Sequence, residues 1–356
     1  MTRVRARGED IRRFIVESVE KHASDIAKVT AARFDVTRQA VSKHLQKLTG
    51  EGCLTETGHT RNRVYKLAPL ADWTHLYQIV PGLAEDVIWA DDIRGVLGQL
   101  PENVMDIWHH GFTEMFNNAV DHSAGQSIYV KIIKTAASTE MIISDDGVGI
   151  FRKIQAALGL LDERHAILEL SKGKLTTDPK RHSGEGIFFT SRMFDNFQIL
   201  SGGAFFTHEH GGADDWLLER ERSSVGTTVF MRINNHTSRT TKKVFDAYVS
   251  GDDFDFTKTV VPVDLARYGN DKLISRSQAK RVLARVELFK TVVLDFNGVE
   301  SIGQAFSDEI FRVFANEHPE IKLLAINTKS EVRRMIDRAR SAKEATESTT
   351  DESKGN

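Results

Sequence analysis

The sequence predicts a multidomain α+β protein, because three successive segments show three different patterns of secondary structure. Residues 1–68 have the spacing of three helices followed by a two-stranded hairpin. Residues 101–235 alternate helices and strands around a long polar stretch, and residues 255–340 carry a shorter α/β pattern. With 356 residues, 40% of them hydrophobic, the chain is long enough to build two or three such cores.

The N-terminal segment is predicted to be a winged helix-turn-helix domain. Its apolar residues recur at helical spacing, and Ser24 and Thr37 are suited to begin the second and third helices. Gly50 and Gly52 end the third helix, and a hairpin with a polar turn follows. The predicted elements are helices over Glu9–Glu20, Ser24–Arg33 and 37–50, and strands over Cys53–Thr57 and Arg63–Leu67.

The third predicted helix carries side chains suited to reading DNA. In helix-turn-helix proteins the N-terminal residues of the second helix of the motif meet the base edges in the major groove. Arg pairs with guanine, Gln with adenine, and Ser or Thr reaches phosphate or base. The segment also holds 14 Lys and Arg against 8 Asp and Glu, while the whole chain has a net charge of −2. The candidate DNA contacts are Thr37, Arg38, Gln39, Ser42 and Lys43 on the helix, and Arg61 and Arg63 on the hairpin.

The stretch Val-Thr-Arg-Gln-Ala-Val-Ser-Lys-His-Leu at residues 36–45 resembles the recognition helix of ArsR/MarR-type winged-helix regulators. The resemblance implies binding to double-stranded DNA, and such readers usually bind as symmetric dimers. We therefore expect a homodimer. The alternative is a winged helix used only for protein contacts, and the basic residues on the exposed face favour DNA.

The middle of the chain is predicted to be an α+β sandwich preceded by a connector. Residues 69–100 are mixed in character, with Pro69, Pro81 and Pro101 as breaks, and we expect them to form a connector with one helix. After it, helical and strand periodicities alternate around a polar stretch at 151–183. The predicted elements are helices over Glu85–Leu100, Glu102–His122 and Glu185–Asp195, and strands over Ser127–Lys134, Glu140–Ser144 and onward to Ile233.

Three short motifs in this middle segment carry the chemistry of a nucleotide site. In the first motif, at 113–122, Glu114, Asn118 and Asp121 lie at i, i+4 and i+7 and share one helix face. The oxygen of Asn118 suits a hard, hydrated Mg²⁺ ion. Glu114, one turn earlier, is placed to polarise a water or hydroxyl near a phosphate.

The second and third motifs are rich in glycine. Asp145 ends a strand before Gly147 and Gly149, so its carboxylate could accept a hydrogen bond from an adenine amino group while the glycines let the backbone approach the purine. Gly184 and Gly186 precede a helix, and the N-terminus of a helix favours phosphate.

In this order the three motifs resemble the N, G1 and G2 boxes of the GHKL superfamily, which includes the gyrase B subunit, histidine kinases and anti-sigma-factor kinases. The resemblance implies a Bergerat-fold domain that binds ATP and Mg²⁺, with Asn118 as metal ligand, Glu114 as catalytic base and Asp145 as the adenine reader. The stretch 226–229 resembles the family's final strand, whose Thr supports the Asp–adenine contact. The implied nucleotide-binding residues are Asn118, Asp121, Asp145, Gly147, Gly149, Ile150, Gly184, Gly186, Ile187, Thr227 and Thr228.

The polar stretch 151–183 is expected to be a mobile lid over this site. Its cations are candidates for phosphate contact, and the alternative for each is a solvated loop. They are Lys172, Lys174, Lys180, Arg181 and His182.

The C-terminal segment is predicted to be a small α/β domain. Residues 291–302 resemble the central strand of STAS domains, the fold of anti-anti-sigma factors, and 303–311 resemble an uncharacterised STAS-like family. This implies an interaction module with a protein partner. Gln304 and Ala305 stand where anti-anti-sigma factors carry a phosphorylatable Ser, and Ser307 is expected to cap a helix or lie on the surface. The predicted elements are helices over Ser277–Val286 and Ala305–Phe314, strands over Thr291–Phe296 and Ile321–Ile326, and a disordered tail over 341–356.

Composition narrows the class of protein. The single cysteine, Cys53, excludes a disulfide framework or a Cys-based zinc site within one chain. There is no apolar run of membrane-spanning length and no apolar signal-peptide core, so we expect a cytoplasmic protein. A histidine kinase is not expected, because His109 and His110 lie beside the first motif on the same predicted helix.

The predicted function is a DNA-binding regulator in which the nucleotide state of the middle domain controls DNA binding or a partner interaction. One alternative is a protein serine/threonine kinase of the anti-sigma type. Another is a GHKL ATPase clamp stimulated by DNA. The sequence leaves open whether ATP is hydrolysed, transferred to a protein or only sensed.

Overall fold

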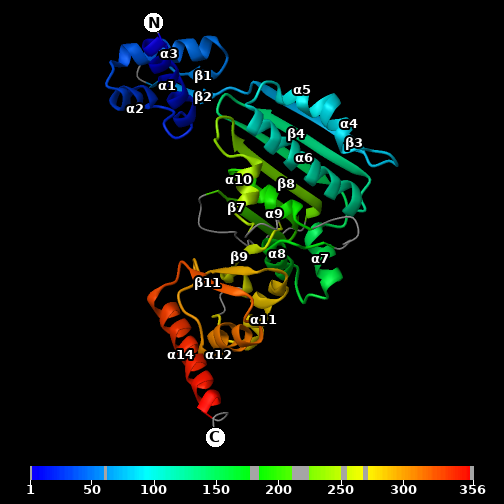
Figure 1. Cartoon of the computed structure of the whole chain (residues 1–356). Coiled ribbons are helices and arrows are strands. Elements are labelled where there is room, and N and C mark those ends of the chain that lie inside the picture. The colour runs from blue at the N-terminus through cyan, green and yellow to red at the C-terminus, as the bar shows by residue number, and fades with distance from the viewer. Residues whose placement is uncertain are drawn as a thin grey trace.

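The molecule is a multidomain α+β protein whose three parts follow one another from the N-terminus to the C-terminus (Figure 1). This arrangement confirms the predicted fold class at that level. No helix in the part of the chain that the structure describes is long and apolar enough to cross a membrane. The computed structural model describes residues 2–59, 62–176, 184–210, 224–249, 255–267 and 272–352.

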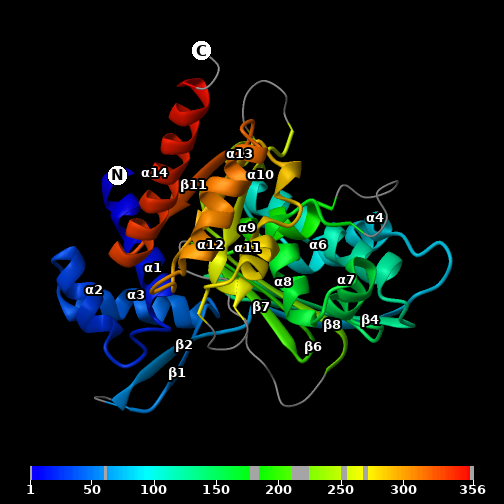
Figure 2. The ribbon, with the colours of Figure 1, turned by 90° about the horizontal axis from the view of Figure 1, so that it is seen from below.

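The N-terminal part consists of three helices and a hairpin, as the periodicity predicts. Val41, Leu45 and Leu48 form the buried stripe of the third helix, and Ile15 of the first helix belongs to the same core. The hairpin extends beyond these helices (Figure 2). The elements are α1 (Thr2–Ser18), α2 (Ile26–Phe34), α3 (Arg38–Gly50), β1 (Leu54–Thr57) and β2 (Val64–Leu67).

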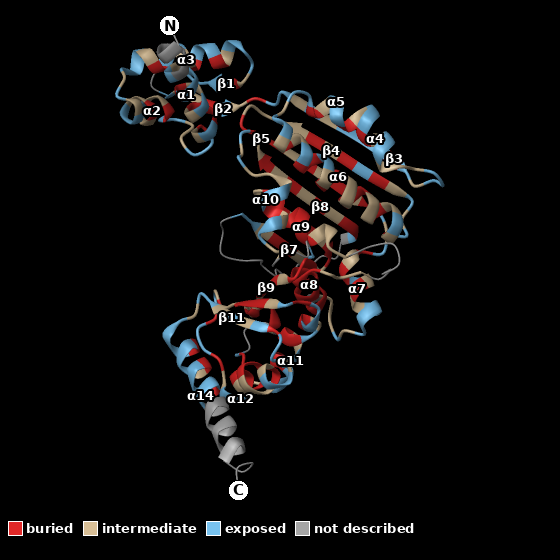
Figure 3. Cartoon of the chain, in the orientation of Figure 1, coloured by how far each residue is buried: buried red, intermediate tan, exposed pale blue. Residues whose placement is uncertain are grey.

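The middle part is built on a six-stranded antiparallel sheet with the strand order β3-β4-β5-β8-β6-β7. Helices α6 (Glu102–His122) and α9 (Gly186–Met193) cover one face, and buried residues alternate with more exposed ones along the central strands (Figure 3). The strands are β3 (Ala71–Gln78), β4 (Ser127–Lys134), β5 (Ser138–Asp145), β6 (Asn196–Gly202), β7 (Ala204–Glu209) and β8 (Ser224–Asn234).

The segment 69–100 is an integral piece of this sheet and not the connector that the sequence predicted. Strand β3 pairs with β4 over its full length, from Ala71 opposite Lys134 to Gln78 opposite Ser127. Three short helical stretches follow and bury Trp89, Ile93 and Leu97 in the same core as α6. The prediction failed because an edge strand exposed over most of its length lacks a regular apolar period. The three stretches are α4 (Glu85–Ile88), η2 (Trp89–Ile93) and α5 (Arg94–Leu97).

The stretch predicted as a polar lid contains two helices, α7 (Ile150–Leu158) and α8 (Glu163–Lys172). Every residue from 165 to 172 is buried, although four of these eight are polar or charged (Figure 3). The reason is that α8 lies between the middle sheet and the C-terminal part, so that both of its faces are covered (Figure 1).

The C-terminal part holds a three-stranded parallel sheet with the order β11-β10-β9, flanked by helices. A capping box between Ser275 and Gln278 begins its first helix. The last helix reaches Glu352, so the expected disordered tail is helical up to that residue, and it points away from the rest of the molecule (Figure 1 and Figure 2). The elements from 241 onward are α10 (Thr241–Asp246), β9 (Lys258–Pro262), η3 (Val263–Ala266), α11 (Arg276–Leu283), η4 (Val286–Leu288), β10 (Thr291–Asp295), α12 (Gln304–Asp308), η5 (Glu309–Phe314), α13 (Ala315–Glu317), β11 (Lys322–Ile326) and α14 (Ser330–Glu352).

Candidate functional site

A cavity of about 270 Å³ lies between helices α6, α7, α8 and α9 and the covered face of the middle sheet. Residues from all three predicted motifs line it, although the motifs lie far apart in the sequence. The predicted residues that line the cavity are Glu114, Asn118, Asp145, Ile150, Gly184, Gly186, Ile187 and Thr227. Four other predicted residues do not line it, namely Asp121, Gly147, Gly149 and Thr228.

Asp145 presents a buried carboxylate to this cavity from the end of β5. Its side chain is 8% exposed, and its Oδ1 accepts hydrogen bonds from the backbone N–H of Gly147 at 2.9 Å and of Thr227 at 3.2 Å. Burial raises the pKa of this carboxyl above its usual range, while the two N–H groups act in the opposite direction. Asp145 is therefore held in one orientation as a buried acceptor in the cavity wall.

The two threonines of β8 have different roles because successive side chains of a strand point to opposite faces. The Oγ1 of Thr227 lies on the cavity side and accepts a hydrogen bond from the N–H of Ile150 at 3.0 Å, which anchors the start of α7. Thr228 points to the other face, where its hydroxyl is 2.7 Å from that of Ser144. Thr228 therefore does not line the cavity.

Helix α6 brings Glu114 and Asn118 to the cavity, one turn apart, as their spacing predicts. A Cβ at position 186 would collide with the carboxylate of Glu114 in its present position, so a larger residue at the start of α9 would require this side chain to move. Asp121 is exposed on the last turn of the helix and does not line the cavity, although Ala119 and His122 on either side of it do.

The other two glycines shape the turn between β5 and α7 and do not form the cavity wall. The N–H of Gly147 donates a hydrogen bond to the carboxylate of Asp145. A Cβ at position 147 would collide with the backbone of Ser123 at the end of α6. Gly149 has a φ of +95° and stands directly before α7. The turn thus positions Asp145 and Ile150, which do line the cavity.

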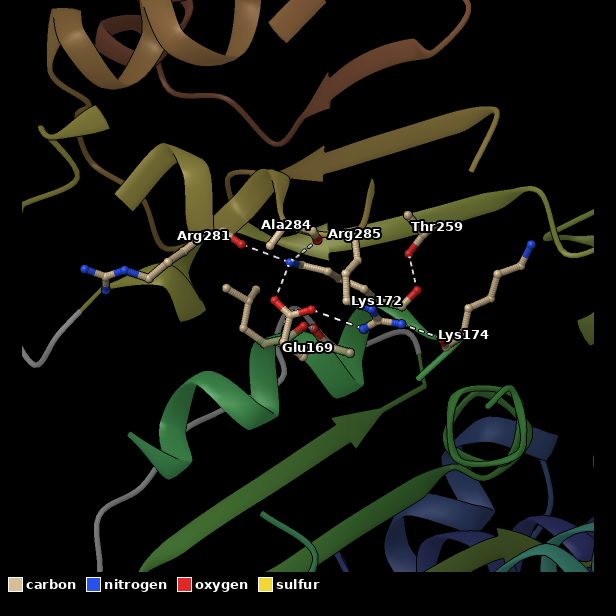
Figure 4. A network of polar contacts seen from close by, with 9 residues as sticks. Glu169, Lys172, Lys174, Thr259, Arg281, Ala284 and Arg285 are labelled. Carbon is tan, nitrogen blue, oxygen red and sulfur yellow. Dashed lines mark hydrogen bonds and ion pairs between the residues drawn. The ribbon is translucent and has the colours of Figure 1, made fainter. Parts of the chain in front are cut away.

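The two described lysines proposed for phosphate contact face the C-terminal part instead (Figure 4). Lys172 is fully buried, and its Nζ donates to Glu169 and to the carbonyl oxygens of Arg281 and Ala284. Lys174 donates to the carbonyl of Leu288 at 3.3 Å. Lys180, Arg181 and His182 lie outside the described residues.

Lys153 is a cavity residue that the motifs did not predict. Its Nζ donates to the carbonyl oxygen of His122 at 2.8 Å, at the C-terminal end of α6. Among the described residues that line the cavity, it is the only lysine or arginine. Its position three residues after Ile150 on a helix was the available signal, because that spacing puts both on one face. Much of the remaining lining is apolar, including Met115, Ile154, Leu170 and Leu175.

The predicted DNA-reading residues are exposed at the start of α3. Arg38, Gln39, Ser42 and Lys43 lie on its outer face, whereas the hydroxyl of Thr37 accepts the N–H of Ala40 and caps the helix. On the hairpin, the Nη1 of Arg63 is held within 3.4 Å of the Tyr65 hydroxyl and 3.5 Å of the Glu56 carboxylate. Arg61 lies outside the described residues.

Residues 278–333 match the family model of a STAS-like domain of unknown function (DUF4325). The match runs from α11 through β10 and β11 to the start of α14, so the C-terminal part is a STAS-like domain. A comparison with curated proteins returned no match to the chain.

Proposed function

We propose that this protein binds Mg·ATP in the cavity of its middle part, as a GHKL domain with the Bergerat fold, and double-stranded DNA through an N-terminal winged helix. Nucleotide occupancy then controls DNA binding or contact with a protein partner. The observation that carries this proposal is the meeting of all three motifs around one cavity, with the buried carboxylate of Asp145 in its wall.

The lining residues fit the parts of a nucleotide. Apolar side chains such as Met115 and Ile154 suit the faces of a purine, and Asp145 supplies an acceptor for its amino group. No cluster of three or more His, Cys, Asp or Glu side chains that could hold a metal occurs among the described residues. In this proposal Mg²⁺ is held by Asn118, which lines the cavity, together with phosphate oxygens and water. Glu114, which also lines the cavity, is the residue we propose to activate a water near the terminal phosphate.

The contacts of the N-terminal part support a link between nucleotide and DNA. Ala137, in the turn between β4 and β5, is buried in the same apolar cluster as Tyr65 of the hairpin. Glu20 also pairs with Arg232 of β8 at 2.8 Å, although an exposed pair of this kind contributes only about 0–1 kcal/mol. Strand β5 thus begins beside the DNA-reading part and ends at Asp145.

The STAS-like domain favours the kinase as a second candidate function, because anti-sigma-type kinases act on STAS proteins. Within this chain, Ser307 is a poor acceptor. It is 1% exposed, and its hydroxyl donates to the carbonyl of Met335 at 3.0 Å. A kinase activity would therefore need an acceptor serine other than Ser307. Transfer of phosphate to a partner identifies this function, and turnover stimulated by DNA identifies the ATPase clamp.

The test is to measure binding and turnover of Mg·ATP with and without duplex DNA. We expect Asp145→Asn to lose binding, and Glu114→Ala to bind without turnover. The matched control is Asp146→Asn. Asp146 is the exposed neighbour of Asp145, and its carboxylate accepts hydrogen bonds from the backbone N–H groups of Gln126 and Ser127 outside the cavity. A wild-type protein that binds no nucleotide would overturn the proposal, as would equal losses in the Asp145 and Asp146 variants.

A further inference from the structure

Helix α8 and the residues after it touch both the cavity and the STAS-like domain. Leu170, Leu175 and Thr176 line the cavity. Between them in the sequence, Lys172 and Lys174 bond to the STAS-like domain (Figure 4). The stretch from Glu169 to Thr176, called here the 169–176 segment, is therefore shared by the two domains.

Lys172 is the centre of the contact. Its side chain is 0% exposed, and its Nζ donates to Glu169 Oε1 at 2.7 Å and to the carbonyl oxygens of Arg281 and Ala284 at 2.9 and 2.7 Å. All three ammonium protons thus have acceptors. The two carbonyls belong to the C-terminal end of α11, where the helix dipole favours a cation. A buried ammonium is tolerated only with such complete pairing, so small displacements of α11 relative to α8 are costly.

Two further side chains hold the same segment from the STAS-like side. Arg285 donates through Nη1 to Glu169 Oε2 at 3.2 Å and through Nη2 to the carbonyl oxygen of Lys174. The hydroxyl of Thr259 on β9 donates to the carbonyl of Lys172 at 2.6 Å. The segment is therefore bonded to β9, to the C-terminal end of α11 and to Arg285, two residues after that helix (Figure 4).

We propose that the STAS-like domain clamps the 169–176 segment, so that nucleotide binding in the cavity and the position of α11 are energetically coupled. The inference rests on the nucleotide site proposed above. A nucleotide that displaces Leu170 or Leu175 must either break the buried bonds of Lys172 or carry α11 with the segment, and the second costs less. Coupling is reciprocal, so a partner that engages α11 changes nucleotide affinity by the same factor.

The test uses the full chain and a non-hydrolysable ATP analogue with Mg²⁺. The variant Arg285→Gln removes a charged link to Glu169 and Lys174 without touching a cavity residue. The matched control is Arg312→Gln, whose guanidinium pairs with Asp308 inside the STAS-like domain. We expect Arg285→Gln to lower the Kd of the analogue by at least about fivefold, because the segment then moves more easily without α11, and the control to change it less than about twofold.

The second measurement needs no variant. Amide hydrogen exchange of residues 276–288 in the wild-type protein is expected to change when the analogue binds, because α11 moves with the segment. If wild type binds the analogue but the two variants have equal Kd values and exchange at 276–288 is unchanged, the clamp is refuted and the nucleotide site stands. If wild type binds no analogue, the proposed function and the clamp both fail.

Discussion

Replacing Lys172 by Met is expected to loosen the contact between α8 and the STAS-like domain. The change keeps the length of the side chain but removes an ammonium that is 0% exposed. Glu169, at 4% exposure, then keeps only Arg285 as a charged partner, and the carbonyls of Arg281 and Ala284 lose a donor. Breaking a buried pair costs about 3–5 kcal/mol, and since Arg285 remains, we expect the lower end, about 3 kcal/mol. That corresponds to roughly a hundredfold in the local opening equilibrium.

Native-state hydrogen exchange measures this local opening directly, residue by residue in α11. Fluorescence is unsuited to it, because the described tryptophans, Trp73, Trp89 and Trp108, all belong to the middle part. The matched control is Lys280→Met on the same helix, because the Lys280 side chain is 71% exposed and its Nζ is 3.7 Å from Glu309 Oε1. It is expected to change the opening free energy by no more than about 0.5 kcal/mol. Equal effects of the two substitutions would refute the reasoning that the buried contact of Lys172 holds the domains together.

Two further predictions concern pH and salt. Burial lowers the pKa of His110 from 6.5 to about 4. Between these pH values the unfolded chain binds a proton at His110 that the folded domain does not bind. The free energy of unfolding of the middle part therefore falls as the pH drops from 6.5 toward 4, by up to about 3 kcal/mol. Urea unfolding followed by tryptophan fluorescence should show this loss of stability at low pH in His109→Asn but not in His110→Asn. The same pH dependence in His110→Asn as in the wild type would contradict the prediction. Lys43→Ala should reduce the slope of the logarithm of DNA affinity against the logarithm of salt concentration by about 0.9, because one phosphate contact is lost. Lys242→Ala, at an exposed lysine outside the N-terminal part, should leave the slope unchanged. Identical slopes for the two variants would show that Lys43 does not contact DNA.

Helical periodicity and motif spacing carried much of the prediction. Helix α6 lies at Glu102–His122 as expected, and Glu114 and Asn118 reach one cavity because four residues make about one helical turn. The helical spacing of Val41, Leu45 and Leu48 likewise predicted the buried stripe of α3. Such features depend on neighbours within a few residues, so the sequence contains them directly.

The sequence could not show which side chains meet across long separations. In the sequence, Lys172 cannot be told apart from a solvated lysine in a polar loop. It is buried between two domains only because α11 packs against it, and its partner Arg281 is 109 residues away in the sequence. Lys153 enters the cavity because the turn after β5 orients α7. Likewise, 69–78 forms an edge strand because β4 offers it a partner. The sequence by itself determined local helices, strands and the order of three motifs, whereas tertiary packing decided which charges are buried, because burial depends on what the rest of the chain places against them.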